Sequence, residues 1–567
     1  MALSLASGPR DQALWHKTLG TLIDEQAQTY GDRLAVVFPQ QNVQRTYNQL
    51  AERSHRIANA LYQSGLQPGD GIGVLAGNCY QYIEIFLAGG YAGCSVVVLN
   101  NTYSPEELQR AISISKCKML CIAPSIGKKS LEEHVKLVRD SENQVKEIVL
   151  LSGSFLSGTS TRVSSYSSFV DRGSVPGNQA LARQRQTAIK PDDLLNLQFT
   201  SGTTGSPKAA MLTHVNLINN GRFVGDKMLL TPDDVVCCPP PLFHCFGLVM
   251  GFLGAFTHGS AIVFPSEQFD ADLVLDAVAI YKCTALLGVP TMFVAELEAN
   301  RRKNISITTV RTGLAAGSPV PMVIMKQLEE EMNIRSMLIA YGMTETSPVT
   351  FLTAVEDPLE RRLKTVGKVM PHTSAKIIDT DGRIVPIGVR GEICTSGYAL
   401  QKGYWENEEK TREVMKRDEN GILWMYTGDE GVIDSEGYCT ITGRIKDIII
   451  RGGENIFPVE IEERLLAHTR VSEACVVAVP DEKYGEVVGC FLRHDPLSRQ
   501  RPPNAEIRSW AKQTMGSHKA PQYVWWVGDV GVGEDFPKTG SGKYQKHILR
   551  DVARKLIKSV GGVRAKL

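Results

Sequence analysis

The apolar positions in the first part of the chain follow two alternating patterns. Between residues 47 and 61 they recur every three or four residues, the spacing of a helix with one buried face. Short continuous apolar runs, typical of buried strands, separate this stretch from later helical ones. The predicted order is a helix at 47–61, a strand at Ile72–Leu75, a helix at Tyr80–Ala92, a strand at Ser95–Leu99, a helix at Pro105–Ile114 and a strand at Met119–Ala123. Such alternation predicts a parallel α/β sheet built with crossover helices.

The pattern weakens and then returns further along the chain. Between Ser152 and Asn178 the sequence is rich in Ser and Gly, so we expect a mobile surface excursion there. Alternation resumes with a strand at Ala261–Phe264, a helix at Leu273–Ala279 and strands at Ala285–Val289 and Met337–Ala340. From Val366 to Tyr404, short runs on either side of Asp381-Gly382 predict antiparallel strands joined by a hairpin. A β-rich subdomain is therefore expected to close the large domain.

A further change of pattern near residues 443–447 predicts a domain boundary. Beyond it we expect strands at Ile448–Ile450, Cys475–Val479 and Tyr523–Val527, a turn at Gly452-Gly453, and helices at Pro458–His468 and Asn504–Met515. These elements form a unit large enough to fold independently. The expected fold is thus a large N-terminal α/β domain over 1–443, with parallel α/β sheets and a β-rich subdomain, a hinge over 444–447, and a smaller α+β C-terminal domain over 448–567.

Composition narrows the class of protein. The 567 residues include 62 basic and 61 acidic ones, so charge gives no reason to expect nucleic acid or an anionic membrane as a partner. The 12 cysteines contain no CxxC pair, which favours buried free thiols in a reducing compartment over a zinc site. From Val235 to Ser266 there is no Asp, Glu, Lys or Arg. Its prolines, histidines and glycines nevertheless favour a buried helix followed by a strand over a transmembrane segment.

The most informative stretch is Thr200–Lys208, which lies between the apolar runs Leu194–Phe199 and Ala209–Leu212. Its glycines allow backbone N–H groups to converge on an anion, and its hydroxyls and lysine add donors and charge. The spacing is not that of a Walker A loop. An ordinary hairpin turn is the alternative. After the loop, Thr213 is expected to cap a helix through Asn216–Phe223.

Five ordered segments carry a family resemblance: LQFTSGTTGSPKAAMLTH (197–214), YGMTET (341–346), YTGD (426–429), GRIKD (443–447) and PKTGSGK (537–543). The set resembles the adenylate-forming superfamily of acyl-CoA synthetases, aryl-CoA ligases, luciferases and peptide-synthetase adenylation domains. Within it, Pro241–Gly247 and Pro207–His214 look most like medium-chain acyl-CoA ligases. The resemblance implies ATP, Mg²⁺ and CoA: a carboxylate attacks the α-phosphate to give acyl-AMP and pyrophosphate, and a thiolate then displaces AMP.

The resemblance also assigns phosphate-binding roles. Residues implied to hold the β- and γ-phosphates are Thr200, Ser201, Gly202, Thr203, Thr204, Gly205 and Lys208. In the segment that begins Tyr341-Gly342, Thr344 is implied to bond the α-phosphate and Glu345 to hold Mg²⁺, which prefers a carboxylate plus phosphate oxygens. A solvated surface carboxylate is the alternative for Glu345. Its place after a glycine turn and an apolar strand favours a strand-end crevice.

Other positions are implied to bind the nucleoside and to act in catalysis. Asp429 matches the acceptor of the ribose hydroxyls, and Arg444 would reach the ribose or a phosphate. Gly317 and Ser318 would line the adenine and the acyl carboxylate, although Ala-Ala-Gly stands where many relatives carry Gly-Gly. Lys543, in a glycine-bracketed loop, would be the catalytic lysine that bridges carboxylate and phosphate. Relatives often have Ile and Arg at the positions of Tyr544 and Lys546, but this departure leaves Lys543 itself unaffected.

Domain rotation is also implied by the resemblance. Lys446 resembles the hinge residue about which the small domain turns, and Gly452 and Gly453 would then approach CoA. Phe243 and His244 are candidates for the acyl pocket and its gate, with a satisfied buried histidine as the alternative. The segments expected to line the pocket are Phe243–Val249, Gly288–Met292, Leu314–Gly317 and Thr346–Val349. They offer no cation for a second carboxylate, which favours an aliphatic or aryl monocarboxylate of moderate size.

The end of the sequence, Ala565-Lys566-Leu567, is close to the Ser-Lys-Leu address read by the peroxisomal import receptor. We expect a peroxisomal location, or a cytoplasmic one if the tail is accidental; the first residues do not match a secretory signal. Two other functions stay open. One is transfer of the acyl group to a carrier-protein phosphopantetheine, and the other is a non-catalytic acyl-adenylate or nucleotide-binding protein. The pathway, fatty-acid breakdown or a specialised metabolite, also stays open.

Overall fold

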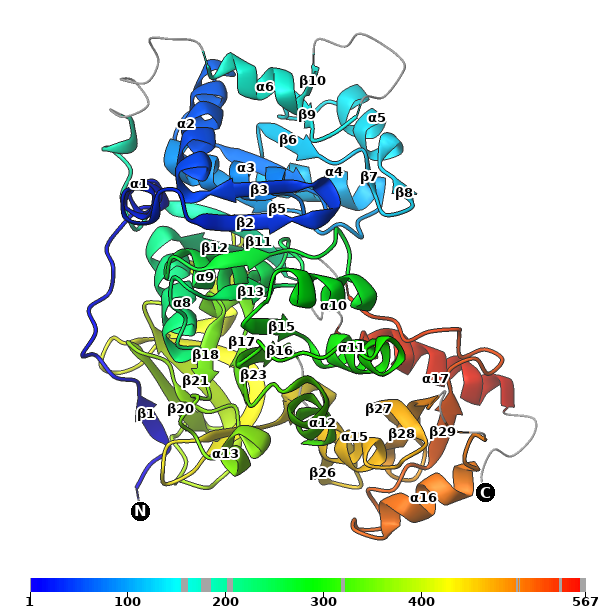
Figure 1. Ribbon diagram of the computed structural model, residues 1–567. Helices are drawn as coiled ribbons and strands as arrows, with labels where there is room; N and C mark the ends of the chain where they lie inside the picture. The colour runs from blue at the N-terminus through cyan, green and yellow to red at the C-terminus, as the bar shows by residue number, and fades with distance from the viewer. Residues whose placement is uncertain are drawn as a thin grey trace.

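The computed structural model describes residues 2–153, 162–174, 185–200, 207–317, 322–495, 498, 500–539 and 543–560. In Figure 1 two α/β layers occupy the upper and middle parts of the molecule, a β-rich unit lies below them, and the C-terminal unit lies to one side. A large α/β domain with a smaller α+β domain is the architecture that the sequence predicts.

The first layer is a mostly parallel sheet. Ile72 of its central strand pairs with Val96 on one side and Met119 on the other, both in parallel, as crossover helices require. At one edge β11 and β12 are antiparallel, and the chain between them is the predicted phosphate-type loop. The strand order is β10 (Val163–Ser165), β9 (Glu147–Leu150), β6 (Met119–Ile122), β4 (Gly71–Leu75), β5 (Ser95–Val98), β11 (Leu194–Thr200) and β12 (Lys208–Thr213).

The second layer brings several strand ends to one edge. Strands β13 to β17 run parallel to one another, so the segments that follow β15, β16 and β17 meet where α/β sheets bind ligands. These segments carry Val289, Gly317 and Thr344. The strand order is β19 (Lys368–Val369), β18 (Val349–Leu352), β17 (Ser336–Gly342), β16 (Thr312–Ala316), β15 (Ala285–Gly288), β13 (Val235–Cys237), β14 (Ala261–Val263), β2 (Leu34–Phe38) and β3 (Val43–Thr46).

Local sequence signals explain several helix starts. The side chains of Thr46 and Thr213 each accept a hydrogen bond from the backbone three residues later, and Gln49 and Asn216 return it, so α2 and α8 begin with capping boxes. The helices of the two layers are α1 (Leu19–Tyr30), α2 (Tyr47–Gln63), α3 (Tyr80–Ala92), α4 (Pro105–Ser115), α5 (Glu132–Asp140), α6 (Tyr166–Arg172), α8 (His214–Lys227), the π-helix η2 (Phe246–Leu253), α9 (Gly254–Phe256), α10 (Ala271–Ile280), α11 (Pro290–Lys303), α12 (Met322–Met332) and α13 (Leu359–Lys364).

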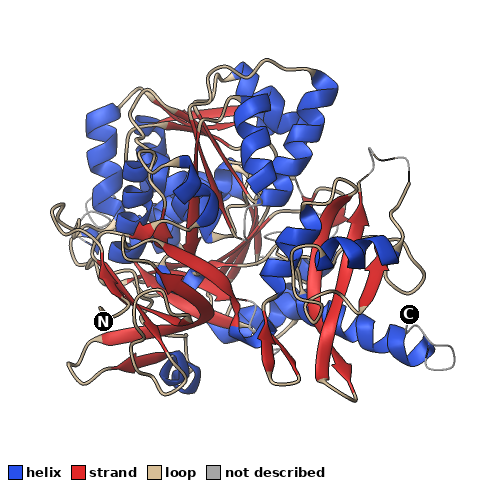
Figure 2. Cartoon of the chain, turned by 90° about the horizontal axis from the view of Figure 1, so that it is seen from below, coloured by secondary structure: helices blue, strands red, loops and turns tan. Residues whose placement is uncertain are grey.

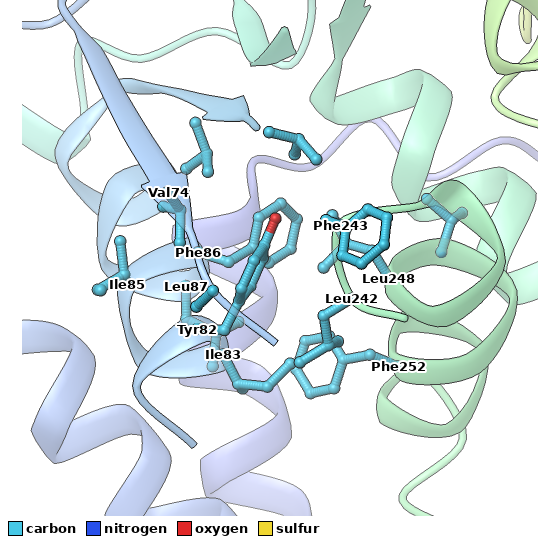
Figure 3. Packing of buried hydrophobic residues seen from close by; sticks show 14 of the residues in the cluster. Val74, Tyr82, Ile83, Ile85, Phe86, Leu87, Leu242, Phe243, Leu248 and Phe252 are labelled. Carbon is cyan, nitrogen blue, oxygen red and sulfur yellow. The ribbon is translucent and has the colours of Figure 1, made fainter. Parts of the chain in front are cut away.

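Aromatic and aliphatic side chains join the two layers. Figure 3 shows Tyr82 and Phe86 of α3 facing Leu242, Phe243 and Phe252 from the segment that contains η2. The rings of Phe86 and Phe252 meet edge-on, with centroids 6.4 Å apart. The apolar run 235–266 is therefore core, as predicted, and no helix in the described ranges has the length and apolarity of a membrane span. All 12 cysteines are buried free thiols.

The β-rich unit is antiparallel, and the start of the chain completes it. Its strand order is β1 (Leu5–Ser7), β20 (Thr373–Ile378), β21 (Gly391–Gly397), β23 (Leu423–Ile433) and β22 (Met415–Arg417), with β24 (Cys439–Arg444) on β23 and α14 (Glu408–Val414) beside it. Strand β1 was not predicted. From it an N-terminal strap, residues 8–18, returns to α8, where Asn219 exchanges hydrogen bonds of 2.7 and 3.0 Å with the backbone of Trp15.

The C-terminal unit has its own sheet (Figure 2). Buried apolar side chains form a core on each face of this sheet. Its strand order is β26 (Glu454–Ile456), β25 (Ile449–Arg451), β28 (Gly485–His494) and β27 (Val471–Asp481), with β29 (Tyr523–Trp526) also on β28. Its helices are α15 (Pro458–Leu466), α16 (Asn504–Lys512) and α17 (Lys546–Val560). The short helix η4 (Ile445–Asp447) joins the unit to β24.

One expectation about the first layer is wrong. Residues 162–174 do not form part of a mobile surface excursion, because β10 pairs with β9 and α6 packs on the sheet with Tyr166, Phe169 and Val170 buried. The segment is too short, and too rich in serine, for three apolar side chains to produce a visible helical period. Residues 154–161 and 175–184 lie outside the described residues.

A buried carboxyl group in α11 predicts a pH-dependent stability. Glu296 is fully buried and neither of its oxygens has a hydrogen-bond partner within the described chain, and burial raises its pKa from 4.5 to about 8. The folded state therefore holds a proton that the unfolded chain releases at lower pH, so stability falls as pH rises through this window. Glu296→Gln removes the ionisable group, and we expect it to raise the melting temperature by an amount that grows with pH. The underlying difference in the free energy of unfolding is about 1.4 kcal/mol for each unit by which the pKa of Glu296 is raised.

Thermal melts at about pH 5, 7 and 9 measure this difference. Glu298→Gln on the exposed face of the same helix is the matched control and should change little at any pH. A gain for Glu296→Gln that is the same at all three values would contradict the assignment of a protonated carboxyl group.

Candidate active site

A lysine of the C-terminal unit reaches the strand ends of the large domain. Gly317 follows β16 with a φ of +94°, a conformation that favours glycine. A Cβ atom added at Gly317 would lie 3.8 Å from Cε of Lys543. Two residues that the sequence assigns to one site, although they are far apart in the chain, therefore lie side by side.

Asp429 is the anchor of a second group of predicted residues. Its buried carboxylate accepts a hydrogen bond of 2.7 Å from the hydroxyl of Tyr341 and lies 3.1 Å from Nε of Arg444. Asp429 and Arg444 lie directly opposite each other in the antiparallel pair of strands β23 and β24. Gly428, with a φ of +72°, lies within β23 directly before Asp429, where the pairing of β23 with β21 is irregular. This arrangement holds the carboxylate in place beside the guanidinium of Arg444, which can also bind a phosphate.

The electrostatic surroundings of Lys543 connect these groups. Burial and, next, the positive charge of Arg444 lower its pKa, whereas the carboxylates of Asp429 and Glu345 act in the opposite direction. The half-buried ammonium is thus close to both carboxylates and to the guanidinium of Arg444. A mobile surface lysine would not experience this environment.

Glu345 is suited to hold a metal ion together with phosphate oxygens. It lies in the short helix η3 (Thr344–Thr346), is 6% exposed, and accepts a hydrogen bond of 2.8 Å at Oε1 from the hydroxyl of Tyr404. Across the described ranges no group of three or more His, Cys, Asp or Glu side chains could hold a metal alone. A single hard carboxylate fits Mg²⁺, which usually takes its other ligands from phosphates and water.

The phosphate-type loop is described at its two ends. Thr200 Oγ1 donates to the carbonyl oxygen of Lys208 over 3.4 Å, and the Lys208 ammonium lies 5.1 Å from the ring centroid of Tyr404. Predicted site residues outside the described residues are Ser201, Gly202, Thr203, Thr204, Gly205, Ser318, Ala565, Lys566 and Leu567, together with the glycines at 540 and 542.

The candidate acyl gate lies close to the lysine. His244 is half-buried, and its Nδ1 accepts a hydrogen bond of 3.1 Å from the backbone N–H of Phe246. Burial, followed by the charge of Lys543, lowers its pKa to about 3, so the ring is neutral at physiological pH. Phe243 is buried beside it. His244 therefore has a hydrogen-bond partner at one ring nitrogen, the backbone N–H of Phe246, and it lies close to Lys543. This position suits a gate.

The predicted hinge residue lies at the start of the C-terminal unit, and the predicted CoA residues lie on the surface of that unit. Lys446 lies in η4, and the next residue, Asp447, pairs with Arg550 of α17 over 3.1 Å. Gly452 and Gly453 form the exposed turn between β25 and β26, with φ values of +59° and +89°. They belong to the C-terminal unit and would have to move with it to meet a ligand in the crevice.

Sequence reasoning missed Tyr404, and it named Cys245 only as part of the pocket segment Phe243–Val249. Tyr404 contacts both Glu345 and Lys208, and the thiol of Cys245, which donates to Oε1 of Gln198 over 3.1 Å, lies within the electrostatic reach of Lys543. Tyr404 occurs in Gly403-Tyr404-Trp405, where a tyrosine between a glycine and a tryptophan is the only local signal. No spacing rule connects it to residue 345.

Comparison with known proteins agrees with this geometry. Residues 23–405 match the family model described as AMP-binding enzyme, and residues 460–543 match the AMP-binding enzyme C-terminal domain. Acyl-CoA ligase sidI of Aspergillus fumigatus is 50% identical over 98% of this chain and 94% of its own length. The mitochondrial medium-chain acyl-CoA ligase ACSF2 of Danio rerio is 36% identical over 98% of this chain and 91% of its own. The crystal structure of ATP-bound MatB from Rhodopseudomonas palustris superposes with a TM-score of 0.79 at 27% identity. The match covers 95% of this chain and 100% of that chain.

The chain belongs to the AMP-binding enzyme family. Within that family it is an acyl-CoA ligase, an enzyme that uses ATP to adenylate a carboxylic acid and then joins the acyl group to CoA. The predicted resemblance and the class of enzyme are confirmed.

Proposed function

We propose that this ligase activates a monocarboxylic acid with an uncharged tail, and that Lys543 is its catalytic residue for acyl-adenylate formation. The observation that carries the proposal is the position of Lys543 beside Gly317, among the charges of Arg444, Asp429 and Glu345. Attack of a carboxylate on the α-phosphate brings two anions together. A fixed ammonium between them stabilises the charge that develops in the transition state.

The surrounding residues are suited to orient ATP. Asp429, fixed by Tyr341 and Arg444, would accept the ribose hydroxyls, and Thr344 would donate to the α-phosphate. Lys208 and the loop before it would hold the β- and γ-phosphates. When bound at Glu345, Mg²⁺ would neutralise phosphate charge. These contacts hold the α-phosphate in line with the acid, and this positioning accounts for a large part of such catalysis.

Charge decides which acids fit. The four segments expected to line the pocket, which lie near Phe243, Val289, Leu314 and Val349, contain no Asp, Glu, Lys or Arg. Because a second carboxylate buried there would have no cationic partner, its desolvation would strongly oppose binding. His244, neutral at physiological pH, does not supply that charge.

Acid-dependent pyrophosphate release, measured with ATP and Mg²⁺ across matched mono- and dicarboxylates, tests this proposal. We expect release with monocarboxylates of moderate size and, on addition of CoA, a product with the mass of the acyl-CoA. Release that is faster with dicarboxylates would contradict the uncharged pocket. Release without an acyl-CoA product would favour a carrier-protein acceptor instead.

The second half-reaction requires the C-terminal unit to move. Lys543 lies in the crevice, whereas the Gly452-Gly453 turn is exposed on the same unit. We propose that rotation about Lys446 withdraws the lysine and brings this turn towards CoA, with His244 gating the path to the acyl group. Each half-reaction would thus be served by a different face of one small domain.

The tail predicts where the enzyme acts. Residues Ala565-Lys566-Leu567 support binding to the peroxisomal import receptor. We expect that deleting these three residues will disperse a fluorescent fusion into the cytosol without changing the activity of the purified enzyme. Replacing the tail with Ser-Lys-Leu should restore the punctate pattern, and a punctate pattern that survives the deletion would refute peroxisomal targeting by this tail.

A further inference from the structure

We infer that Tyr404 is a positioning residue of the adenylation site, whose hydroxyl orients Glu345 and whose ring orients Lys208. The inference rests on the proposed roles of these two side chains as ligands of the metal and of the phosphates. Tyr404 is then a third residue of the site. It would contact neither the metal nor the phosphates itself, but it orients the charged groups of Glu345 and Lys208 that do.

The hydroxyl contact is buried. Tyr404 is 5% exposed and donates its hydroxyl hydrogen to Oε1 of Glu345 over 2.8 Å. Hydrogen bonds to a charged acceptor are stronger than those between neutral groups, and here no solvent competes with the contact. One carboxylate oxygen is thereby fixed, and this contact limits the rotation of the group.

The ring contact acts on the other charge. The ammonium of Lys208 lies 5.1 Å from the centroid of the Tyr404 ring, within the range of a cation–π interaction. Lysine has a long, flexible side chain, and the aromatic face limits the directions in which it can point. Lys208 is the last residue of the phosphate-type loop, so the stacked position keeps its charge close to that loop.

The backbone around Tyr404 is held by both elements that carry its partners. Met211 of β12 donates to the carbonyl oxygen of Gly403 over 3.0 Å, and Trp405 donates to that of Ala209 over 2.8 Å. On the other side, the backbone N–H of Gln401 donates to the carbonyl oxygen of Glu345 over 2.9 Å. The segment 401–405 therefore joins the exit strand of the phosphate-type loop to η3, and Tyr404 lies between them.

The two contacts can be separated by substitution. Tyr404→Phe keeps the ring and removes the hydroxyl, whereas Tyr404→Leu removes both contacts. Calorimetric titration with the non-hydrolysable analogue α,β-methylene-ATP, with and without Mg²⁺, measures binding independently of turnover. For Tyr404→Phe we expect Mg²⁺-free affinity to be unchanged and the gain in affinity that Mg²⁺ provides to fall about tenfold. Tyr404→Leu should lose this gain and also bind the Mg²⁺-free analogue about threefold more weakly.

Tyr398→Phe is the matched control. Tyr398 lies three residues before this segment, its ring packs edge-on against Phe223, and its buried hydroxyl makes no hydrogen bond to Glu345 or Lys208 in the described chain. The same chemical change there should leave both affinities unchanged. Thermal melts of every variant establish that it is folded under the conditions of the titration.

Glu345→Gln separates failure of this inference from failure of the proposed function. If Glu345→Gln keeps the full Mg²⁺-dependent gain, the role proposed for Glu345 is wrong. If Glu345→Gln loses the gain but Tyr404→Phe keeps it, Tyr404 does not position the carboxylate and the inference is overturned. A Tyr404→Phe variant that melts at a lower temperature and still keeps the gain would show a purely structural residue and would also overturn the inference.

Discussion

Replacing Lys543 with alanine will slow acyl-adenylate formation by about a hundredfold to a thousandfold, the loss typical of removing one preorganised group from a developing charge. The ammonium lies beside Gly317, and its pKa reflects Arg444, Asp429 and Glu345, so its removal leaves a site with too little positive charge for two approaching anions. Thioester formation from supplied acyl-AMP should largely persist, because the phosphoryl chemistry is then complete.

Measuring the two half-reactions separately tests this expectation. Pyrophosphate release reports the first, and acyl-CoA production from synthetic acyl-AMP reports the second. Lys555→Ala, on the exposed side of α17, is a control for loss of a positive charge from the same unit. Equal losses in both half-reactions would mean that the role of Lys543 is misassigned.

Asp429→Asn should produce a different pattern. The carboxylate accepts from Tyr341 and pairs with Arg444, so the amide leaves a guanidinium without its counter-charge and a ribose without its acceptor. We expect the KM for ATP to rise about a hundredfold, the equivalent of one or two lost charged hydrogen bonds. Because AMP stays bound through both half-reactions, thioester formation from acyl-AMP should weaken as well.

Initial-rate kinetics with varied ATP and varied acyl-AMP measure both effects. Asp381→Asn, in the exposed hairpin turn, makes the same substitution far from the crevice and should change neither constant. An Asp429→Asn enzyme with a normal dependence on acyl-AMP would exclude the nucleoside as the ligand of this carboxylate.

Local patterns predicted most of the elements that position the site. Helix α3 spans Tyr80–Ala92, as expected, because its long, mostly apolar run is followed by Gly93 in the left-handed conformation that ends helices. The phosphate-type loop likewise falls between two paired strands, β11 and β12. In both cases the determining interactions lie within a few residues of one another, so they are visible in the sequence.

Long-range partners could not be predicted in this way. Strand β1 pairs with β20, and Tyr404 bonds Glu345 across 59 residues, because the topology of the sheets brings them together. A tyrosine or a short apolar strand carries no mark of its partner. Family motifs named Glu345, Asp429 and Lys543, but the contacts that hold each of these side chains became visible only in the structure.

The pairing of the first residues with the β-rich unit has a consequence for the order in which the protein can mature on the ribosome. The hydroxyl of Ser4 donates to the carbonyl oxygen of Pro386, 382 positions later. Residues 2–18 therefore emerge long before the strand that receives them, and they must wait while both α/β layers are synthesised. Closing so large a loop is slow, since the entropy of the intervening chain is lost before the contacts form. The β-rich unit is thus completed late in synthesis, and any ligand binding that depends on Asp429 and Arg444 is among the last properties that the nascent chain acquires.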